Sequence, residues 1–222
     1  MMEIEEIALF HSPLKEKFGL PRQSGLAPSL KGSIIFLPGH RNPDALKGLE
    51  GFSHIWLIWG FSANRHKSSS PLVRPPRLGG NQSVGVFASR SPYRPNPLGI
   101  SAVKIESIEL EAPQGPTIHV LGADLMDGTP IYDIKPYIRY SDCIPEAKSG
   151  FADSTPWKPL DILDQKNLLS VFGLEENALR EILLQDPRPR YQEEGREYGL
   201  LFDGRNVRFT VEGGVLIILE VE

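Results

Sequence analysis

The residues with the clearest chemical bias form a basic segment in the middle of the chain. No Asp or Glu stands between Glu50 and Glu106. The whole chain carries a net charge of −4, so the +7 of this segment leaves −11 on the remainder. Such a concentration of positive charge in an acidic protein indicates a face that binds anions, against the alternative of a solvated arginine-rich loop. The basic residues of the segment are Arg65, Lys67, Arg74, Arg77, Arg90, Arg94 and Lys104.

The second half of this segment, residues 74–101, is rich in proline and glycine as well as arginine. Proline fixes φ and glycine permits positive φ, so loops of this composition adopt defined shapes. An arginine on a stiff loop presents its guanidinium fork in a fixed direction, which suits a phosphate or a carboxylate. One short strand, residues 84–88, is expected between the two loops.

A second group of polar residues, with three aspartates, lies at positions 123–137, one strand pair after the basic segment. Asp127 followed by glycine is typical of a tight turn, and turn chemistry alone would explain it. Asp133 and Lys135 are two positions apart, so on a strand they share one face, either as part of a site or as a plain surface ion pair. A ligand with both a negative and a positive group would suit this pair of segments. The polar residues concerned are Asp124, Asp127, Asp133, Lys135 and Tyr137.

The composition indicates a soluble protein built from many short strands. Hydrophobic residues make up 40% of the 222 positions, and 21 glycines with 20 prolines imply many turns. The single cysteine, Cys143, excludes an internal disulfide and a cysteine-based metal cluster. The N-terminus is acidic, and no stretch approaches the roughly 18 apolar residues that span a membrane. We therefore expect a cytoplasmic protein with no membrane segment and no metal.

Hydrophobic patterning predicts the elements that position these residues. A short helix is expected to begin at Asn42, a capping residue followed by proline, and to end at Gly48. Residues 52–61 are almost wholly apolar, which indicates a buried strand, and we expect the His54 within it to be a core histidine rather than a ligand. The strands predicted for the first part of the chain are residues 4–10, 33–37, 52–61, 100–110 and 117–122.

The composition changes after Tyr140, and residues 143–159 are typical of a linker. Apolar spacing predicts helices over residues 160–172 and 175–185. Three strands joined by tight turns are expected to follow, at residues 198–202, 206–211 and 215–221. The chain is therefore expected to have a first domain over residues 1–142 and a small α+β domain over residues 160–222.

Several common enzyme classes are not supported by any motif in the sequence. The phosphate-binding pattern GxxxxGK[ST] is absent, and no GxGxxG follows a first strand, which argues against the usual nucleotide folds. No HExxH or Cys/His cluster indicates zinc, and the serine-hydrolase pattern GxSxG is missing. The functions that remain for this protein are catalysis without a metal ion and simple ligand binding.

Five motifs, in order, resemble the TrmO family, also called TsaA-like or YaeB-like tRNA methyltransferases. The resemblance covers residues 3 to about 142 closely and extends to the tail through residues 185–191 (QDPRPRY) and 206–208 (NVR). Motifs of this length in this order are specific. They are residues 21–23 (PRQ), 51–56 (GFSHIW), 74–80 (RPPRLGG), 85–99 (GVFASRSPYRPNPLG) and 124–137 (DLMDGTPIYDIKPY).

The resemblance implies a mainly β fold: a single-sheet β-barrel that binds S-adenosylmethionine, followed by the small α+β domain. It also implies a homodimer and methylation of N6 of N6-threonylcarbamoyladenosine next to the anticodon of a threonine tRNA. Many bacterial members have His-Gln where this chain has Ser62-Ala63, so side-chain contacts of that pair are lost here. The implied cofactor contacts are Pro21, Arg22, Gln23, Ser62, Ala63, Arg90, Leu125, Asp127, Gly128, Thr129 and Pro130.

The reaction that the resemblance implies assigns roles to the remaining polar residues. The acceptor nitrogen is conjugated to a purine and a carbonyl, so its proton must leave, and a base helps. Our candidates are Asp133 or Asp127 as the base, with Lys135 or Tyr137 polarising the carbonyl. The basic segment would grip the anticodon stem-loop, and exposed aromatic rings would stack on unpaired bases. The candidate RNA contacts are Arg65, Lys67, Arg74, Arg77, Tyr93 and Arg94.

Two other functions remain open from the sequence. The chain could be an RNA-binding module without turnover, which would not need S-adenosylmethionine. It could also be a methyltransferase of the same fold with another acceptor, which the Ser62-Ala63 difference leaves open. The C-terminal domain either covers the barrel or contacts tRNA through Arg188 and Arg190.

Overall fold

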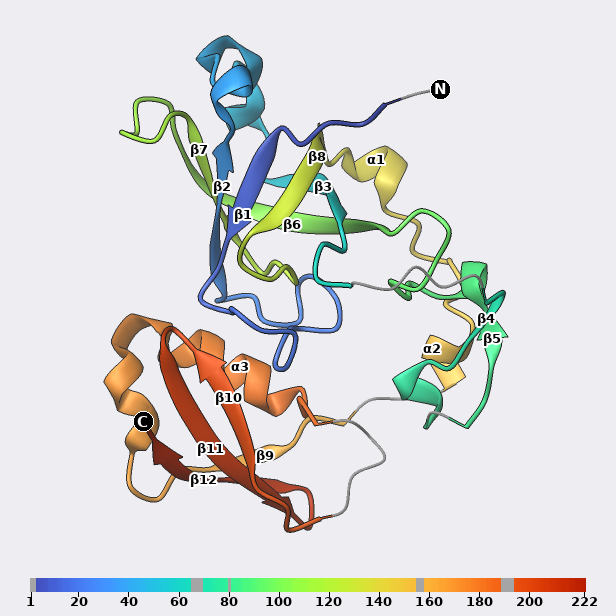
Figure 1. The fold of residues 1–222 in the computed structure, drawn as a ribbon, viewed down its shortest axis with the longest axis vertical. Helices are drawn as coiled ribbons and strands as arrows, with labels where there is room; N and C mark the ends of the chain where they lie inside the picture. Colours follow the sequence, from blue (N-terminus) through green and yellow to red (C-terminus); the bar gives the residue numbers. More distant parts are fainter. Residues whose placement is uncertain (1–2, 65–69, 80, 155–157, 189–193) are drawn as a thin grey trace.

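The computed structural model describes residues 3–64, 70–79, 81–154, 158–188 and 194–222. Within them, six strands form a closed barrel in the order β1-β2-β7-β6-β3-β8, with every neighbouring pair antiparallel (Figure 1). Closure removes the exposed strand edges that an open sheet would leave. The barrel strands are β1 (Ala8–His11), β2 (Lys31–Phe36), β3 (His54–Gly60), β6 (Leu98–Glu109), β7 (Thr117–Leu121) and β8 (Thr129–Pro136).

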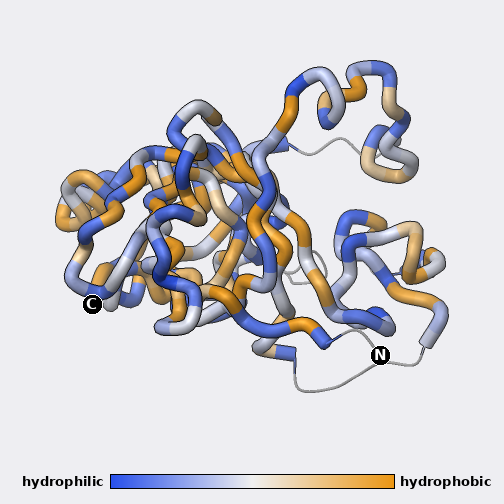
Figure 2. Tube along the Cα trace, turned by 90° about the horizontal axis from the view of Figure 1, so that it is seen from above, coloured by the Kyte–Doolittle hydropathy of each residue, from blue (hydrophilic) through white to orange (hydrophobic). Residues whose placement is uncertain are grey.

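Alternating residues of these strands fill the barrel with apolar side chains. Along β2 every second residue is buried. Figure 2 shows apolar and polar residues interspersed along the tube of the chain. Gly99 faces the ring of Trp59 across β3 and β6, and a Cβ there would lie 2.3 Å from the ring. The barrel core is made chiefly of Ala8, Phe10, Ile34, Ile55, Leu57, Trp59, Val103, Ile118, Val120, Leu125 and Ile131.

The strand predictions for the barrel are confirmed within a few residues, but β8 was not predicted and the position of His54 was wrong. β8 directly follows the tight turn expected at Asp127-Gly128. It was missed because its apolar residues are interrupted by proline, aspartate and lysine. His54 begins β3, where it is exposed and its Nδ1 lies 2.9 Å from the Ser53 hydroxyl. The start of the first short helix is confirmed, since the Asn42 side chain accepts a hydrogen bond from the Asp44 amide at 3.0 Å.

Residues 70–79 and 81–97 form an arm at the side of the barrel (Figure 1). It consists of short pieces because prolines and glycines interrupt it. The expected strand over residues 84–88 is limited to Val84–Gly85, and a 3-10 turn follows. Arg77 donates a hydrogen bond at 2.8 Å to the carbonyl of Ala152 in α2 (Phe151–Ser154). The elements of the arm are β4 (Leu72–Val73), η4 (Pro76–Leu78), β5 (Val84–Gly85) and η5 (Val86–Ala88).

Short helices complete the first part of the chain. Three 3-10 helices lie between β2 and β3, and one turn of α-helix follows β8. They are η1 (Pro38–His40), η2 (Pro43–Leu46), η3 (Leu49–Gly51) and α1 (Arg139–Asp142). None of the helices in the described part of the chain is long and apolar enough to cross a membrane.

The described C-terminal residues form a sheet of order β10-β11-β12-β9 packed against a helix. The helix predicted over residues 160–172 is wrong in its first part, where a strand pairs in parallel with β12. The Asp164 carboxylate then accepts hydrogen bonds from the amides of Leu168 and Leu169, which starts a 3-10 helix. The elements are β9 (Asp161–Leu163), η6 (Leu168–Glu175), α3 (Glu176–Leu184), β10 (Tyr198–Phe202), β11 (Arg205–Glu212) and β12 (Val215–Val221).

The connection between β1 and β2, residues 12–30, packs into the C-terminal core rather than into the barrel. Leu14, Ala27 and Leu30 are buried in one cluster with residues of α3 and of the C-terminal sheet. Gly19 has φ +89° and lies so close to β10 that a Cβ would come within 2.5 Å of the Leu200 side chain. The two parts of the chain therefore share this loop, and the predicted division at residues 1–142 and 160–222 stays a prediction.

Candidate cofactor and acceptor site

A cavity of about 720 Å³ opens where four separate segments meet. The segments are the β1–β2 loop, the end of β3 with the residues after it, the arm with the start of β6, and the turn between β7 and β8. A volume of this size is typical of sites for small ligands and cofactors. Its apolar lining includes Trp59, Phe61, Phe87, Ile100 and Met126, and its polar lining includes Lys17, Arg22, Gln23, Asn64, Arg90, Arg94 and Asp124.

The Pro21-Arg22-Gln23 segment forms one wall of the cavity. Pro21 is buried, whereas Arg22 is exposed and donates a hydrogen bond from Nη2 to the carbonyl of Asp186 at 3.0 Å. The side-chain amide oxygen Oε1 of Gln23 accepts a hydrogen bond from Nη1 of Arg90, which belongs to the arm. This contact joins two of the predicted cofactor segments, which are 67 residues apart in sequence.

Ser62 and Ala63, the pair that differs from many family members, also line the cavity. Ser62 donates its backbone amide to the carbonyl of Gly60 at 2.8 Å in the turn after β3. The neighbouring Asn64 accepts a hydrogen bond from Lys17 at 2.6 Å, so this turn is tied to the β1–β2 loop. The amide of Ser62 is therefore engaged within the turn.

Asp124 is the only carboxylate among the described residues that line the cavity, and it ends a chain of side-chain hydrogen bonds. Trp59 donates from Nε1 to the Ser101 hydroxyl at 3.0 Å, and Ser101 donates to Asp124 Oδ1 at 2.5 Å. Burial raises the pKa of the Asp124 carboxyl above its usual range, although the Ser101 hydrogen bond and the charge of Arg90 oppose this. The site therefore holds a carboxylate with increased affinity for a proton.

Phe87 places a large apolar surface at the mouth of the cavity. Its side chain is 80% exposed, while the neighbouring Val86 is 4% exposed and anchors the same 3-10 turn. Deeper in the cavity, Phe61 meets Trp59 edge to face with ring centroids 4.4 Å apart. An exposed aromatic ring between basic residues is a feature of surfaces that stack on nucleic-acid bases.

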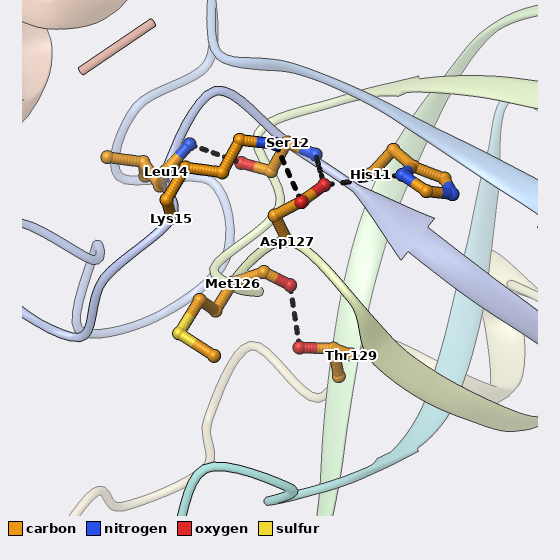
Figure 3. A network of polar contacts seen from close by, with 7 residues as sticks. All are labelled: His11, Ser12, Leu14, Lys15, Met126, Asp127 and Thr129. Carbon is orange, nitrogen blue, oxygen red and sulfur yellow. Dashed lines mark hydrogen bonds and ion pairs between the residues drawn. The ribbon is translucent and has the colours of Figure 1, made fainter. Parts of the chain in front are cut away.

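Asp127 does not line the cavity, and its carboxylate instead contacts residues at the end of β1 and the start of the β1–β2 loop (Figure 3). Its carboxylate accepts hydrogen bonds from the Ser12 amide at 3.1 Å and from Lys15 Nζ at 2.7 Å, and His11 Nδ1 lies 3.3 Å away. Burial alone would raise the pKa of the Asp127 carboxyl, but the Lys15 and Ser12 hydrogen bonds and the nearby charges outweigh it, so the pKa is lowered. The residue fixes the start of the β1–β2 loop to the β7–β8 turn.

The other residues predicted around Asp127 have different environments. Leu125 is buried in the barrel core, and Gly128 adopts φ +75° while its amide donates to the carbonyl of Phe10 at 2.8 Å. Thr129 lines the cavity and donates its hydroxyl to the carbonyl of Met126 at 2.7 Å. Pro130 is buried and pairs with Leu9 of β1.

Like Asp127, the other three predicted catalytic residues do not line the cavity. Asp133 and Lys135 form an ion pair at 2.9 Å with side chains 45% and 63% exposed, as expected for two residues on one face of a strand. Tyr137 packs against Trp56 with ring centroids 5.6 Å apart. Their predicted roles therefore have no support from the geometry of this cavity.

The predicted RNA contacts lie mainly on the arm. Arg94 lines the cavity and donates to the carbonyl of Ser89 at 3.0 Å, and Tyr93 beside it is 47% exposed. Arg74 is exposed, and Arg77 is half-buried against Ala152. Arg65 and Lys67 lie outside the described residues.

Of the two C-terminal arginines proposed to contact tRNA, Arg188 forms an intramolecular ion pair with Asp186 at 2.8 Å, and its side chain is only 14% exposed. Arg190 lies outside the described residues. The sequence analysis assigned no cofactor or catalytic role to Asp124, Phe87 or Lys17, although it named Asp124 among the polar residues of its segment. Asp124 was visible as the first acid after a predicted strand.

Comparison with known proteins identifies the family. A model of the tRNA-methyltransferase O N-terminal domain matches residues 9–143, and a model of the TrmO C-terminal domain matches residues 167–222. The chain belongs to the TrmO family. The predicted family and the predicted barrel with a small α+β part are thus confirmed.

Relatives of this TrmO chain are similar over nearly its whole length. An Escherichia coli protein named tRNA (adenine(37)-N6)-methyltransferase is 40% identical over 94% of this chain and 93% of its own. A Pseudomonas aeruginosa protein named putative S-adenosylmethionine-dependent methyltransferase RcsF is 40% identical over 89% and 87%. A crystal structure of TrmO from Pseudomonas aeruginosa superposes with a TM-score of 0.80 at 31% identity, over 100% of this chain and 98% of that one.

Proposed function

We propose that this TrmO chain transfers a methyl group from S-adenosylmethionine to N6 of adenosine 37 in a tRNA. The observation that carries the proposal is the cavity joining Pro21–Gln23, Ser62-Ala63 and Arg90, in a chain 40% identical to a named tRNA (adenine(37)-N6)-methyltransferase. The acceptor we propose is N6-threonylcarbamoyladenosine, which the family motifs imply.

The residues of the cavity fit S-adenosylmethionine chemically. Arg22 and Arg90 offer guanidinium groups to its carboxylate, for which a bidentate contact is the strong geometry. Trp59 and Phe61 offer apolar and aromatic surface to the cofactor. When bound, the cofactor supplies an already activated methyl group, so the residues of the chain have to position the acceptor and accept its proton.

We assign the proton-accepting role to Asp124 rather than to Asp127 or Asp133. Asp124 lines the cavity, its carboxylate is oriented by Ser101, and burial raises its pKa above the usual range, which makes the carboxylate a stronger base. Asp127 is engaged with the Ser12 amide and Lys15, and Asp133 is paired with Lys135 outside the cavity.

The arm supplies the tRNA side of the site. Phe87 at the mouth of the cavity is placed to stack on an unpaired base, and Arg94 on the same rim is a cation for the threonyl carboxylate. The exposed Arg74 farther along the arm suits backbone phosphates.

A direct test combines calorimetric binding of S-adenosylmethionine with transfer of its labelled methyl group to tRNA. The proposal expects both binding and transfer. A protein that binds tRNA but not the cofactor is an RNA-binding module without turnover. A protein that binds the cofactor but transfers nothing to tRNA has another acceptor.

We also propose a homodimer with the cofactor site near the contact between subunits, as the family motifs imply. Light scattering during size-exclusion chromatography is expected to give about twice the mass of the 24.7 kDa chain. A monomer at micromolar concentration would contradict this part of the proposal.

A further inference from the structure

We propose that the C-terminal part of the chain positions the cofactor loop, residues 12–30, and that Glu181 and Gln185 are positioning residues for S-adenosylmethionine. This inference rests on the proposed function, because it takes Pro21, Arg22 and Gln23 as cofactor contacts. It assigns to the C-terminal part a role at the cofactor site that is separate from any contact with tRNA.

Apolar side chains near both ends and in the middle of the loop are embedded in the C-terminal core. Leu14 near its start, and Ala27 and Leu30 near its end, are at most 1% exposed within the cluster that contains α3 and the C-terminal sheet. Between them, Phe18 stacks on Tyr198 and on Phe209 with ring centroids 6.2 and 6.5 Å apart. The loop therefore owes its apolar packing to residues more than 130 positions later in the sequence.

Two side chains of α3 and its end hold the second half of the loop by polar contacts. The Glu181 carboxylate accepts hydrogen bonds from both the amide and the hydroxyl of Ser29, at 2.7 and 2.8 Å. Gln185 donates from Nε2 to the carbonyl of Leu26 at 3.1 Å. Hydrogen bonds to an ionised carboxylate are among the stronger ones in proteins, so Glu181 is the principal anchor.

A third contact reaches the cofactor residues themselves. The carbonyl of Asp186, the residue after Gln185, accepts the hydrogen bond from Arg22. Asp186 adopts φ +50°, and its carboxylate is held by Nε and Nη2 of Arg188 at 2.8 and 2.9 Å. The next loop residue, Gln23, contacts Arg90 across the cavity, so a path of direct contacts runs from the end of α3 to the cavity wall.

This arrangement predicts a specific effect on binding. A loop that is already ordered loses little conformational entropy when the cofactor binds, whereas a loosened loop has to be ordered at the expense of affinity. Removing the anchors should weaken cofactor binding and leave the chemistry of the bound complex intact, because neither Glu181 nor Gln185 lines the cavity.

The test uses the full-length chain with Glu181 and Gln185 both replaced by alanine. Glu181→Gln alone is the conservative variant, since an amide oxygen can still accept one hydrogen bond from Ser29. Glu220→Gln is the matched control, because it removes a carboxylate of the same C-terminal part that pairs with Arg208 on the exposed sheet face. For each protein, calorimetry gives the Kd for S-adenosylmethionine, kinetics give kcat and the KM for tRNA, and a thermal melt gives Tm.

We expect the double variant to raise the cofactor Kd by about tenfold or more, with kcat at saturating cofactor and KM for tRNA within about twofold of wild type. Glu181→Gln should recover most of the affinity, and Glu220→Gln should leave it unchanged. An unchanged Kd in the double variant would overturn the inference, as would an equal loss in the Glu220 control. If the wild-type chain itself failed to bind the cofactor, the proposed function would fail instead.

Discussion

Asp124 combines the properties that a proton acceptor in this site needs. It lies in the cavity, Ser101 fixes the direction of its carboxylate, and burial raises its pKa. The same burial means that the ionised carboxylate is held at a cost to folding near neutral pH, because its pKa in the folded chain lies above its unfolded value. A residue kept at such a cost in a cavity is a strong candidate for function.

The first prediction concerns Asp124→Asn. We expect kcat to fall by about 100-fold or more, because an amide cannot accept the proton, while the Kd for S-adenosylmethionine stays within a few-fold of wild type. Tm should not decrease, since a costly buried charge is removed. Calorimetry, single-turnover kinetics and a thermal melt measure the three quantities.

A large rise in the cofactor Kd of Asp124→Asn would instead make Asp124 a cofactor ligand. The pH profile gives an independent check of the same role. For the wild-type chain, kcat/KM should decrease as the pH falls through the raised pKa of Asp124, which lies above the ordinary aspartate value of about 3.9.

The second prediction concerns Asp127, whose pKa is lowered in the folded chain. A lowered pKa stabilises the fold above the unfolded value of about 3.9, and this stabilisation is lost as the pH falls through the folded value. Asp127→Asn is therefore expected to lose about 1–2 kcal/mol of stability at pH 7, and the difference from wild type should shrink below pH 4. Urea unfolding at both pH values measures it, and a constant difference would contradict the role given to Lys15 and His11.

The third prediction concerns the exposed ring of Phe87. Phe87→Ala should raise the KM for tRNA by about tenfold, because stacking on a base contributes roughly 1–3 kcal/mol, whereas Phe87→Trp should retain most of the affinity. Neither change should lower Tm, since the side chain is 80% exposed. Steady-state kinetics with tRNA as the varied substrate are the measurement. If the KM for the cofactor rose and that for tRNA did not, Phe87 would belong to the cofactor subsite.

At the scale of the elements, the arm brings basic side chains to the edge of the cavity. Polar contacts hold it to the rest of the chain, among them the hydrogen bond from Arg77 to Ala152 and the contact between Arg90 and Gln23. Its prolines and glycines keep it in short stiff pieces. These features suit a surface that follows a nucleic-acid backbone.

The fourth prediction follows from the charge of the arm. The affinity for tRNA should fall steeply between about 50 and 200 mM salt, because each phosphate contact releases bound counterions. Arg74→Ala should lower the slope of log affinity against log salt by about 1, and Arg205→Ala on the exposed surface of β11 should leave it unchanged. Filter binding over a salt series measures the slope. A flat salt response of the wild-type chain would contradict phosphate binding by the arm.

The elements themselves were largely predictable, and the reasons for the failures are physical. The strand β6 was found because its apolar alternation of period two is local information, and β10 was found because a tight turn follows it. The strand β9 was missed because three residues pair in parallel with β12, a contact more than 50 residues away that leaves no local pattern. The strand β8 was hidden by the polar residues Asp133 and Lys135 on its outer face.

At the scale of the whole molecule, the cavity depends on contacts between segments far apart in the chain. The sequence identified the segments that line it, including Pro21–Gln23, Ser62-Ala63 and Arg90, because their motifs resemble a known family. It did not reveal that the β1–β2 loop packs against the C-terminal part, because Leu14, Ala27 and Leu30 look like ordinary loop residues. Catalytic roles were also predicted for Asp133, Lys135 and Tyr137, because these residues follow the turn closely in sequence. Closeness in sequence does not determine which face of the sheet a side chain occupies.

The measurement that tests the central claim most directly is mass spectrometry of tRNA nucleosides after incubation with the wild-type chain and S-adenosylmethionine. Two tRNA samples are compared, one carrying N6-threonylcarbamoyladenosine and one lacking it. Our account predicts that this nucleoside gains the mass of one methyl group in the first sample and that no nucleoside does so in the second. An unmodified nucleoside in the first sample, with the cofactor bound to the protein, would contradict the proposed acceptor.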